Sequence, residues 1–394
     1  MKNQKYAKRM KRMESKEMKE ILELADVPGL ISFAGGLPAP ELFPIEALKA
    51  SATEVLDSVG RKALQYNDPV GYGPLREWIA KRMETVGASV EAKDILITSG
   101  SQQGLDFAGK VFLDEGDVVL CESPSYLGAI NALGAYECDF IEVPTDDDGM
   151  IIEELEKIAA SNDKIKLVYV IPDFQNPTGK TWSDKRRKEF MEVIEKYGLA
   201  VLEDCPYGEL RYGGESKKSL KSMDKSDRVI YLGTFSKILS PGIRIGWVCA
   251  GEEAMDMFVK VKQRSDVHTN SVSQMEVSNF LANNDIDEHI SKIKELYRKR
   301  RNVMLETIDA NFPEGIQTTR PDGGLFLWVV LPEKMDAKEM LKKAVENNVG
   351  YVPGGAFFPN GDNKNTMRLS FSNMEEEKIV EGIKILAEVI KKEI

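Results

Sequence analysis

Histidine, cysteine and long apolar runs are all scarce in this sequence of 394 residues, and each scarcity excludes a class of protein. The four cysteines lie far apart and form no Cys-x-x-Cys pair, so we expect neither a disulfide framework nor a zinc site. With only His268 and His289, the chain has too few histidines for a histidine metal cage or a serine–histidine hydrolase. We therefore expect no bound metal.

Membrane insertion and nucleic-acid binding are not expected either. One of the longest apolar runs, Gly324 to Pro332, is far shorter than the ~18–20 residues of a membrane span. The chain carries 53 basic and 64 acidic side chains, a net charge of −11, whereas nucleic-acid binders are typically basic. The first twenty residues lack the apolar segment of a signal peptide. These features favour a cytoplasmic protein.

The length predicts about two domains, at roughly 100–200 residues for each domain. Between Leu48 and Asp266, short apolar runs alternate with charged helical stretches. This pattern is typical of α/β proteins with a mostly parallel sheet and helices on both faces. The predicted strands are Ile95–Thr98, Val118–Glu122, Leu167–Ile171, Leu199–Glu203, Val229–Leu232 and Ile243–Ala250. The predicted helices include Gln102–Leu113, Ile151–Ala160 and Asp184–Tyr197.

Beyond Asp285 the pattern changes to a smaller α+β arrangement. The predicted elements there are a long charged helix at Ile286–Asp309, a strand at Leu325–Leu331, a helix at Ala337–Asn347, a strand at Thr366–Ser372 and a final helix from Glu375. We expect an N-terminal lid or arm at 1–47 that contributes to the small domain, a large domain at 48–285 and a small C-terminal domain at 286–394. The small domain is thus expected to form from both chain ends.

The N-terminal segment is rich in lysine and arginine. Apolar residues recur there at helix-like spacing: Met10, Met13, Ile21 and Leu24. The spacing predicts a partly amphipathic helix from about Ser15 to Leu24. Two interpretations remain open, a solvated helix or a lid over the entrance of a pocket.

Candidate ligand-binding residues follow the predicted strands, because ligands of open α/β sheets bind beyond the carboxyl ends of the strands. After Ile95–Thr98 comes Ser99-Gly100-Ser101-Gln102, which opens a helix. Such a turn presents free N–H groups and the positive end of the helix dipole, which suit a phosphate. A serine here can also be a plain N-cap. The chain has no Walker lysine and no GxGxxG motif, so a nucleotide is not the obvious ligand to carry that phosphate.

Two other strand ends supply an amide and a carboxylate. Asn176-Pro177 follows Leu167–Ile171; its fixed amide can bind a ligand hydroxyl, or the pair can simply form a rigid turn. Asp204 follows Leu199–Glu203, with Tyr207 three residues further on. A carboxylate at a buried strand end costs free energy unless it is paired, although this one could instead cap the next helix.

The strand at Val229–Leu232 is followed by Thr234, Ser236 and Lys237, and then by Arg244. Most loop lysines are surface residues, but a lysine in a semi-enclosed pocket can lose its proton and act as a nucleophile or Schiff-base partner. The planar fork of arginine suits a phosphate. A phosphate cradle, an amide, a carboxylate, a phenol and an amine at one sheet edge match the functional groups of pyridoxal 5'-phosphate (PLP).

With this ordered set, the sequence resembles the fold-type I, PLP-dependent class I/II aminotransferases, and among them the branch of 2-aminoadipate, kynurenine and aromatic aminotransferases. The matching segments are Ser32-Phe33-Ala34-Gly35-Gly36-Leu37-Pro38, Gln65-Tyr66, Gly71-Tyr72, Pro74-Leu75-Arg76, Ser123-Pro124-Ser125-Tyr126, Gly323-Gly324-Leu325-Phe326-Leu327-Trp328 and Met367-Arg368-Leu369-Ser370-Phe371. The resemblance implies a transaminase that moves an amino group from an L-amino acid (2-aminoadipate, aromatic or aliphatic) to a 2-oxo acid such as 2-oxoglutarate.

The resemblance also implies roles for the residues around PLP. Lys237 would form the Schiff base and shuttle the proton, and Asp204 would pair with the pyridine nitrogen. Tyr207 and Asn176 would bind the ring hydroxyl, and Tyr126 would stack on the ring. The residues expected to hold the phosphate are Ser101, Gln102, Thr234, Ser236 and Arg244.

Substrate and subunit contacts follow from the same resemblance. Arg368 would clamp the substrate carboxylate, with help from Asn176 and Gly36, although a strand arginine could also form only a surface salt bridge. Tyr66 would reach the phosphate of the neighbouring subunit, which implies a homodimer with shared active sites. These assignments predict that the enzyme works only as an assembled dimer.

The sequence departs from the family pattern at two places. Cys205 follows Asp204 where close relatives often carry a second acidic residue. In the predicted lid, Lys16 and Lys19 stand where the 2-aminoadipate enzymes place a serine and an arginine. Lys19 is expected to contact the substrate and can neutralise a distal carboxylate, but it lacks the guanidinium fork. Aromatic and aliphatic donors therefore stay open.

Two alternative functions follow from the same resemblance. The PLP scaffold also hosts decarboxylation and β-elimination, so a lyase or decarboxylase is one alternative. A non-catalytic, PLP-sensing regulator of the winged-helix type is the other. Such a regulator needs a DNA-binding module ahead of Gly35-Gly36, and we expect the 34 residues before that pair to be too few.

Overall fold

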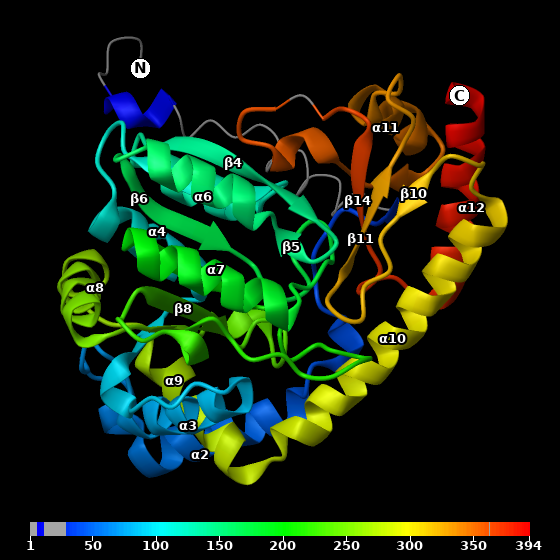
Figure 1. Ribbon diagram of the computed structural model, residues 1–394. Helices are drawn as coiled ribbons and strands as arrows, with labels where there is room; N and C mark the ends of the chain where they lie inside the picture. Colours follow the sequence, from blue (N-terminus) through cyan, green and yellow to red (C-terminus); the bar gives the residue numbers. More distant parts are fainter. Residues whose placement is uncertain (1–5, 12–28, 362) are drawn as a thin grey trace.

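The computed structural model describes residues 6–11, 29–361 and 363–394, and an eight-stranded sheet forms the centre of this part (Figure 1). In spatial order the strands are β2 (Ile95–Thr98), β9 (Gly246–Cys249), β8 (Val229–Thr234), β7 (Ala200–Asp204), β6 (Ile165–Val170), β3 (Val118–Ser123), β4 (Asp139–Asp146) and β5 (Gly149–Met150). The strands from β8 to β4 pair in parallel, whereas β9 and β5 run antiparallel to their neighbours. The predicted mostly parallel sheet is confirmed.

Helices cover both faces of this sheet, because successive side chains of a strand point to opposite faces. One face packs on α4 (Ser101–Phe112), α5 (Leu127–Gly134) and α8 (Glu252–Ser265), and the other on α6 (Ile152–Ser161) and α7 (Asp184–Tyr197), which stand in front of the sheet in Figure 1. On β3, Val119 and Cys121 belong to the first core, and Val118 and Leu120 to the second. We call these the α4 face and the α7 face.

Helix α7 has the bounds that the sequence predicts, since it carries a signal at each end. The Ser183 hydroxyl accepts a hydrogen bond from the Arg186 N–H and caps the first turn. At the other end, Gly198 takes a left-handed conformation with φ of 64°, which ends the helix at Tyr197.

The small domain contains an antiparallel sheet. Its strands, in spatial order, are β10 (Gln317–Thr318), β11 (Phe326–Val330), β14 (Thr366–Ser370) and β13 (Val352–Pro353). Its helices are α10 (Ile286–Asn311), α11 (Ala337–Glu346) and α12 (Glu376–Glu393). Strand β1 (Ile31–Ser32) pairs in parallel with β12 (Val349–Gly350), so an N-terminal segment lies in this domain, as the sequence predicts.

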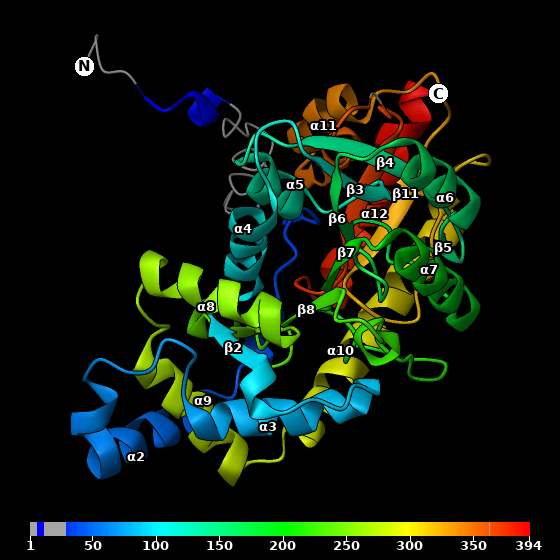
Figure 2. The same ribbon diagram turned by 60° about the vertical axis from the view of Figure 1, so that its left-hand side comes forward.

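A third group of helices lies beside the β2 edge of the large sheet. It consists of α2 (Ile45–Ala63), α3 (Gly73–Met83) and α9 (Ser271–Asn283), which pack together on the side away from the small sheet (Figure 2). The domain boundaries predicted after residues 47 and 285 stay predictions.

Several strands differ from the sequence prediction, β9 and β4 among them. The expected strand Ile243–Ala250 begins only at Gly246, since Pro241–Ile243 forms a 3₁₀ turn and Arg244 takes a left-handed conformation with φ of 59°. Strand β4 is not predicted at all. It lies near the sheet edge, and its sequence DFIEVPTD is mostly half-buried or exposed, so it lacks the continuous apolar run of the central strands.

Two further findings concern the described residues alone. None of their helices combines the length and apolarity needed to cross a membrane. The same residues contain no group of three or more histidine, cysteine, aspartate or glutamate side chains that could hold a metal ion.

A fully buried arginine on α7 ties this helix to the loop that follows β6. The Arg187 guanidinium donates hydrogen bonds to the carbonyl oxygens of Pro172 and Lys218, each at 3.0 Å. It also forms an ion pair with Asp173 at 2.9 Å. The Pro172 carbonyl group and the Asp173 carboxylate are buried, so the guanidinium satisfies two buried acceptors at once.

Arg187→Met should lower the free energy of unfolding by about 3–5 kcal/mol, because it leaves a buried carboxylate and two carbonyl groups with fewer partners. Urea denaturation followed by tryptophan fluorescence measures this change. Lys185→Met is the control on the same helix: its exposed side chain forms an ion pair with Glu189, and the expected change is under about 0.5 kcal/mol. Equal effects of the two substitutions would contradict the assigned role of Arg187.

Candidate active site

A cavity of about 840 Å³ lies where the carboxyl ends of β6, β7 and β8 meet the N-terminus of α4 and the small domain. Its lining contains every described residue that the sequence predicts for the site except Tyr66: Gly36, Ser101, Gln102, Tyr126, Asn176, Asp204, Tyr207, Thr234, Ser236, Lys237, Arg244 and Arg368. These residues come from both domains and from positions up to 332 residues apart in the chain, as 368 − 36 = 332. The fold therefore brings the predicted set together.

Asp204 ends β7 on the α4 face and is almost completely buried. Its Oδ2 accepts a hydrogen bond of 3.0 Å from the Tyr169 hydroxyl of the neighbouring strand β6. Among the described residues, its Oδ1 has no hydrogen-bond donor. Burial raises the pKa of Asp204 to about 7, and the Tyr169 hydrogen bond opposes the rise only in part. The site thus holds a carboxylate oxygen that lacks a donor.

Lys237 follows β8, and its amine lies in the cavity. The Nζ atom donates a hydrogen bond of 2.8 Å to the Gly36 carbonyl oxygen, which belongs to the segment after β1. Burial lowers the pKa of Lys237 to about 8, and the positive charges of Arg368 and Arg244 lower it further. A substantial fraction of this amine is therefore neutral near pH 8, as a nucleophile or base requires.

The N-terminus of α4 and the loop after β8 form a cradle of donors. Gly100, with φ of 80°, takes a conformation that few other residues adopt, and helix α4 follows it. The Thr234 hydroxyl donates to Ser236 Oγ at 2.9 Å, and Arg244 Nη2 donates to the Ser99 carbonyl oxygen at 3.0 Å. At Gly246 an added Cβ would lie 2.7 Å from the Ser101 backbone nitrogen, so only glycine lets β9 approach so closely.

Arg368 on β14 reaches the cavity from the small domain. Its Nη1 donates to Asn176 Oδ1 at 2.8 Å and its Nη2 to the Ala34 carbonyl oxygen at 2.6 Å. The guanidinium also lies over the Phe326 ring, 4.2 Å from the centroid. Burial lowers the pKa of Arg368 to about 10, so it stays cationic at neutral pH. It is a buried cation in contact with an amide, not the surface salt bridge that the sequence left open.

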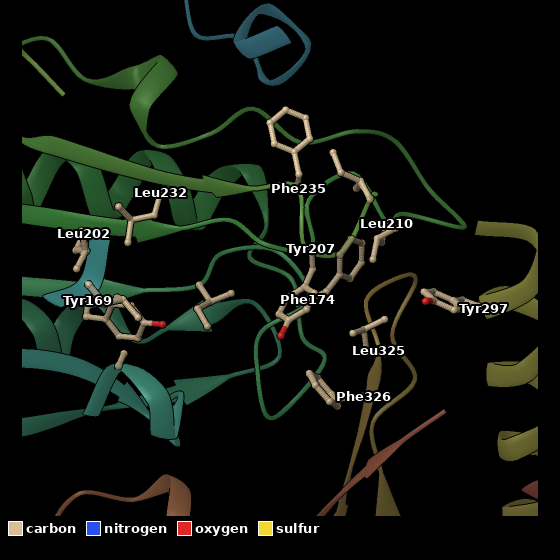
Figure 3. Close-up of a cluster of buried hydrophobic side chains, with 14 of the residues drawn as sticks. Tyr169, Phe174, Leu202, Tyr207, Leu210, Leu232, Phe235, Tyr297, Leu325 and Phe326 are labelled. Carbon is tan, nitrogen blue, oxygen red and sulfur yellow. The ribbon is translucent and has the colours of Figure 1, made fainter. Parts of the chain in front are cut away.

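Two tyrosines complete the walls. Tyr207 packs edge-on against Phe326, with ring centroids 5.8 Å apart, where the large domain contacts the small domain (Figure 3). Burial raises the pKa of Tyr207 and also that of Tyr126, the residue before α5. Both phenols therefore keep their protons at neutral pH and can donate hydrogen bonds.

Sequence reasoning missed several residues of this site. Tyr169 lies within a predicted strand, and its hydroxyl is the one polar group in an otherwise apolar run, a signal that could have found it. Phe326 and Phe357 flank Arg368 with ring centroids 4.2 and 5.1 Å from its guanidinium carbon, yet as apolar residues they carry no chemical signal of their own.

Tyr66 does not line the described cavity. The Tyr66 side chain is exposed, with a relative accessibility of 81%, and its ring contacts His268 edge-on at 6.0 Å. Lys16 and Lys19 lie outside the residues that the structure describes, so their predicted contact with the substrate stays a prediction.

The residues present fit PLP. The donor-free Oδ1 of Asp204 suits a protonated ring nitrogen, the Lys237 amine suits the aldehyde, and the cradle at α4 suits the phosphate. The fold and the site therefore define a PLP-dependent enzyme.

Comparison with known proteins gives the family. The model of the family "Aminotransferase class I and II" matches residues 36–386, and the chain belongs to this family of PLP-dependent transaminases. The aromatic-amino-acid aminotransferase 1 of Thermococcus litoralis is 47% identical over 94% of this chain and 90% of its own.

Two solved structures are also similar. The kynurenine aminotransferase of Pyrococcus horikoshii, solved with PMP, is 44% identical, with a TM-score of 0.94 over 99% of this chain and 97% of its own. The α-aminoadipate aminotransferase of Thermus thermophilus, complexed with N-(5'-phosphopyridoxyl)-L-leucine, is 39% identical, with a TM-score of 0.92 over 98% and 97%.

In the cofactor-free enzyme, Lys237 should titrate with a midpoint near pH 8. The neutral, reactive amine gains population as the pH rises through this value. Arg368→Gln removes a nearby positive charge and should move the midpoint to higher pH. The pH dependence of labelling by an amine-directed reagent, read by peptide mass spectrometry, measures the midpoint. Arg320→Gln, outside the cavity, is the control. A midpoint that Arg368→Gln does not move would contradict the electrostatic coupling between Arg368 and Lys237.

Proposed function

We propose that this transaminase moves the amino group of an aromatic or aliphatic L-amino acid, or of 2-aminoadipate, to a 2-oxo acid such as 2-oxoglutarate. The observation that carries the proposal is the convergence of the Lys237 amine, the Asp204 carboxylate and the Arg368 guanidinium on one cavity. Bound PLP supplies an aldehyde that accepts the amino group and a ring that stabilises negative charge at the substrate Cα.

Lys237 is proposed as the covalent anchor of the cofactor and as the base. Its Nζ atom would bind the aldehyde of PLP and, as a free amine, would accept the proton of the substrate Cα and later return a proton. The lowered pKa of Lys237 supports this role, because a neutral amine is needed to accept a proton near neutral pH.

Asp204 is proposed to hold the ring nitrogen in its protonated form. Its Oδ1 would accept the ring N–H, while Oδ2 stays bound to the Tyr169 hydroxyl at 3.0 Å. A buried carboxylate facing a cation prefers its charged form, so this pairing would lower the pKa of Asp204 again. The negative charge would thereby keep the ring able to withdraw electrons.

The remaining cofactor contacts are proposed from the positions of the donors. Asn176 and Tyr207 would bind the ring hydroxyl, and Tyr126 would stack on the ring face. The phosphate would bind the N-terminus of α4 and the donors that the sequence predicts for it: Ser101, Gln102, Thr234, Ser236 and Arg244. Their common support is that all of them line the same cavity.

Arg368 is proposed to bind the substrate carboxylate. Its Nη1 already donates a hydrogen bond to Asn176 Oδ1 at 2.8 Å, and its Nη2 donates one to the Ala34 carbonyl oxygen at 2.6 Å. A carboxylate that displaces the Ala34 oxygen would gain a charge-assisted hydrogen bond in a dry site, where such bonds are strong.

The walls around Arg368 support a donor with an apolar side chain. Leu37, Leu127, Phe326 and Phe357 line the same cavity and offer apolar contact area. The names of the similar enzymes agree with aromatic donors and with 2-aminoadipate. Whether 2-aminoadipate is used depends on Lys16 and Lys19, which we propose to contact a distal carboxylate.

We expect phenylalanine and leucine to transfer their amino group to 2-oxoglutarate with kcat/KM at least about tenfold above that of alanine, because they bury more apolar surface. Kynurenine and 2-aminoadipate complete the donor series, with glutamate formation as the assay. Lys237→Ala should lose at least about a thousandfold in turnover, and Lys185→Ala, on exposed α7 surface, should retain it. Turnover that survives Lys237→Ala would refute the proposed function.

A homodimer with shared active sites is proposed as the working state. Support comes from Tyr66, whose relative accessibility is 81%, and from exposed apolar side chains close to it in sequence, Val59 at 39% and Leu64 at 74%. Large exposed apolar side chains in one region mark an interaction surface. The cytoplasmic location expected from the sequence stays a prediction.

Mixing two inactive variants tests this arrangement. Tyr66→Ala should bind PLP too weakly for turnover at limiting cofactor, and Lys237→Ala should be inactive at any concentration. In a mixed dimer, one site would combine an intact Lys237 with the intact Tyr66 of the other subunit, so about one quarter of wild-type turnover should return on subunit exchange. Mixed dimers seen by native mass spectrometry without any recovered turnover would contradict shared sites.

A further inference from the structure

Glu122 is a buried carboxylate on the α7 face of the large sheet, near the end of β3. Its relative accessibility is 2%. Its Oε2 accepts a hydrogen bond of 2.9 Å from the Ile171 backbone N–H, and its Oε1 accepts one of 2.9 Å from the indole N–H of Trp182. A buried carboxylate is costly, so two well-formed hydrogen bonds from one loop indicate a specific demand for an acceptor at this position.

The two donors are the two ends of one loop. Residues 171–182 leave β6 at Ile171 and return at Trp182, and Asn176 lies near the middle. The Trp182 backbone N–H also donates to the Pro172 carbonyl oxygen at 2.8 Å, which closes the base of the loop. Glu122 thus joins both ends of the loop to the neighbouring strand β3.

The middle of the loop is tied to the same stretch of chain as Glu122. The Gln175 side-chain amide donates to the Pro124 carbonyl oxygen at 2.6 Å. Its Oε1 accepts hydrogen bonds from the Thr178 N–H at 3.0 Å and from the Thr178 hydroxyl at 2.6 Å. Asn176, between these two residues, accepts the hydrogen bond from Arg368. The chain from Glu122 to Pro124 therefore fixes the loop on both sides of Asn176.

Glu122 does not itself reach the active-site cavity. Side chains alternate along β3, so Glu122 shares the α7 face with Leu120, whereas Cys121 lies on the α4 face. Asp204 and Tyr169 lie on the α4 face too, and Glu122 is not among the residues that line the cavity. Any effect of Glu122 on the substrate must therefore pass through the loop.

We infer that Glu122 is a positioning residue for substrate recognition: by joining both ends of the loop 171–182 to β3, it holds Asn176 where Asn176 orients the guanidinium of Arg368 toward the substrate carboxylate. The inference rests on the proposed function of Arg368. The Ile171 N–H binds Oε2 and the Trp182 N–H binds Oε1, so an amide in the same pose presents an oxygen to only one of the two donors.

Glu122→Gln tests the inference because it turns one acceptor into a donor that faces an N–H. KM for both the amino acid and the 2-oxo acid should rise about tenfold, while kcat changes less than about threefold, since Asp204 ends β7 and Lys237 lies in the loop after β8, both outside the loop 171–182. In an Asn176→Ala background, Glu122→Gln should raise KM by less than about twofold, because its route through Asn176 is already lost.

Trp182→Phe supplies a rescue. It removes the indole N–H that would face the amide of Glu122→Gln, so the double variant should have a lower KM than Glu122→Gln alone. Trp182→Phe by itself removes one of the two hydrogen bonds and should raise KM by a smaller factor. This single variant also keeps the inference testable if Glu122→Gln fails to fold.

Glu203→Gln is the matched control. Glu203 is buried on the α7 face of β7, and it accepts hydrogen bonds from the Leu220 N–H at 2.7 Å and the Lys221 N–H at 2.9 Å. The two donors open the 3₁₀ turn at Lys221–Met223, and this turn carries no residue of the proposed site. Glu203→Gln should therefore lower thermal stability as Glu122→Gln does, but leave both KM values within about twofold of wild type.

The outcomes separate the two proposals. Asn176→Ala is expected to raise KM. If it does and Glu122→Gln has a normal KM, the role of Glu122 is overturned. Trp182→Phe serves in the same comparison if Glu122→Gln does not fold. An additive tenfold effect of Glu122→Gln in the Asn176→Ala background overturns the role of Glu122 as well. Substantial turnover in Lys237→Ala instead overturns the proposed function on which this inference rests.

Discussion

The burial of the Asp204 carboxylate is the constraint on which the rest of the site depends. A carboxylate at the end of a central parallel strand has strands on both sides and little water, so its charge must be matched locally. Tyr169 supplies one hydrogen bond, and among the described residues the other oxygen has no donor. The protein alone therefore raises the pKa of Asp204 to about 7, and the proposed pairing with a cationic ring nitrogen would lower this pKa again.

The two faces of the large sheet carry buried carboxylates with different roles. The α4 face carries Asp204 and Tyr169, whose polar groups contact each other beside the cavity. The α7 face carries Glu122 and Glu203, each of which accepts two N–H groups from a loop that leaves the sheet. Because the side chains of one strand alternate between the faces, a single short strand can serve both purposes with adjacent residues, as Glu203 and Asp204 do.

Much of this site could be predicted from the sequence because its chemistry gathers at strand ends. Asn176, Asp204 and Lys237 each follow a continuous apolar run, and parallel strands bring their carboxyl ends to one edge. Arg244 reaches the same edge for another reason. It precedes β9, which runs antiparallel to β8, so the start of β9 lies beside the end of β8.

Other features could not be predicted because they depend on tertiary contacts. Strand β4 is recognised as a strand only through its pairing with β3 and β5, since half of its residues are polar and only Val143 is fully buried. The exposure of Tyr66 gives no signal in one subunit, because the function proposed for it lies in a second copy. Glu122 is hidden for the opposite reason: a lone glutamate after an apolar run suggests a strand end at the surface, and only the loop geometry reveals its two donors.

The contacts of the segment after β1 have a consequence for selectivity. Two backbone carbonyl groups of this segment, Ala34 and Gly36, already accept hydrogen bonds from Arg368 and Lys237. A molecule that enters must replace these contacts with equally good ones or leave buried donors unsatisfied. An amine without a carboxylate has no acceptor to offer Arg368 in place of the Ala34 oxygen, so this contact would disfavour monoamines before any chemistry begins.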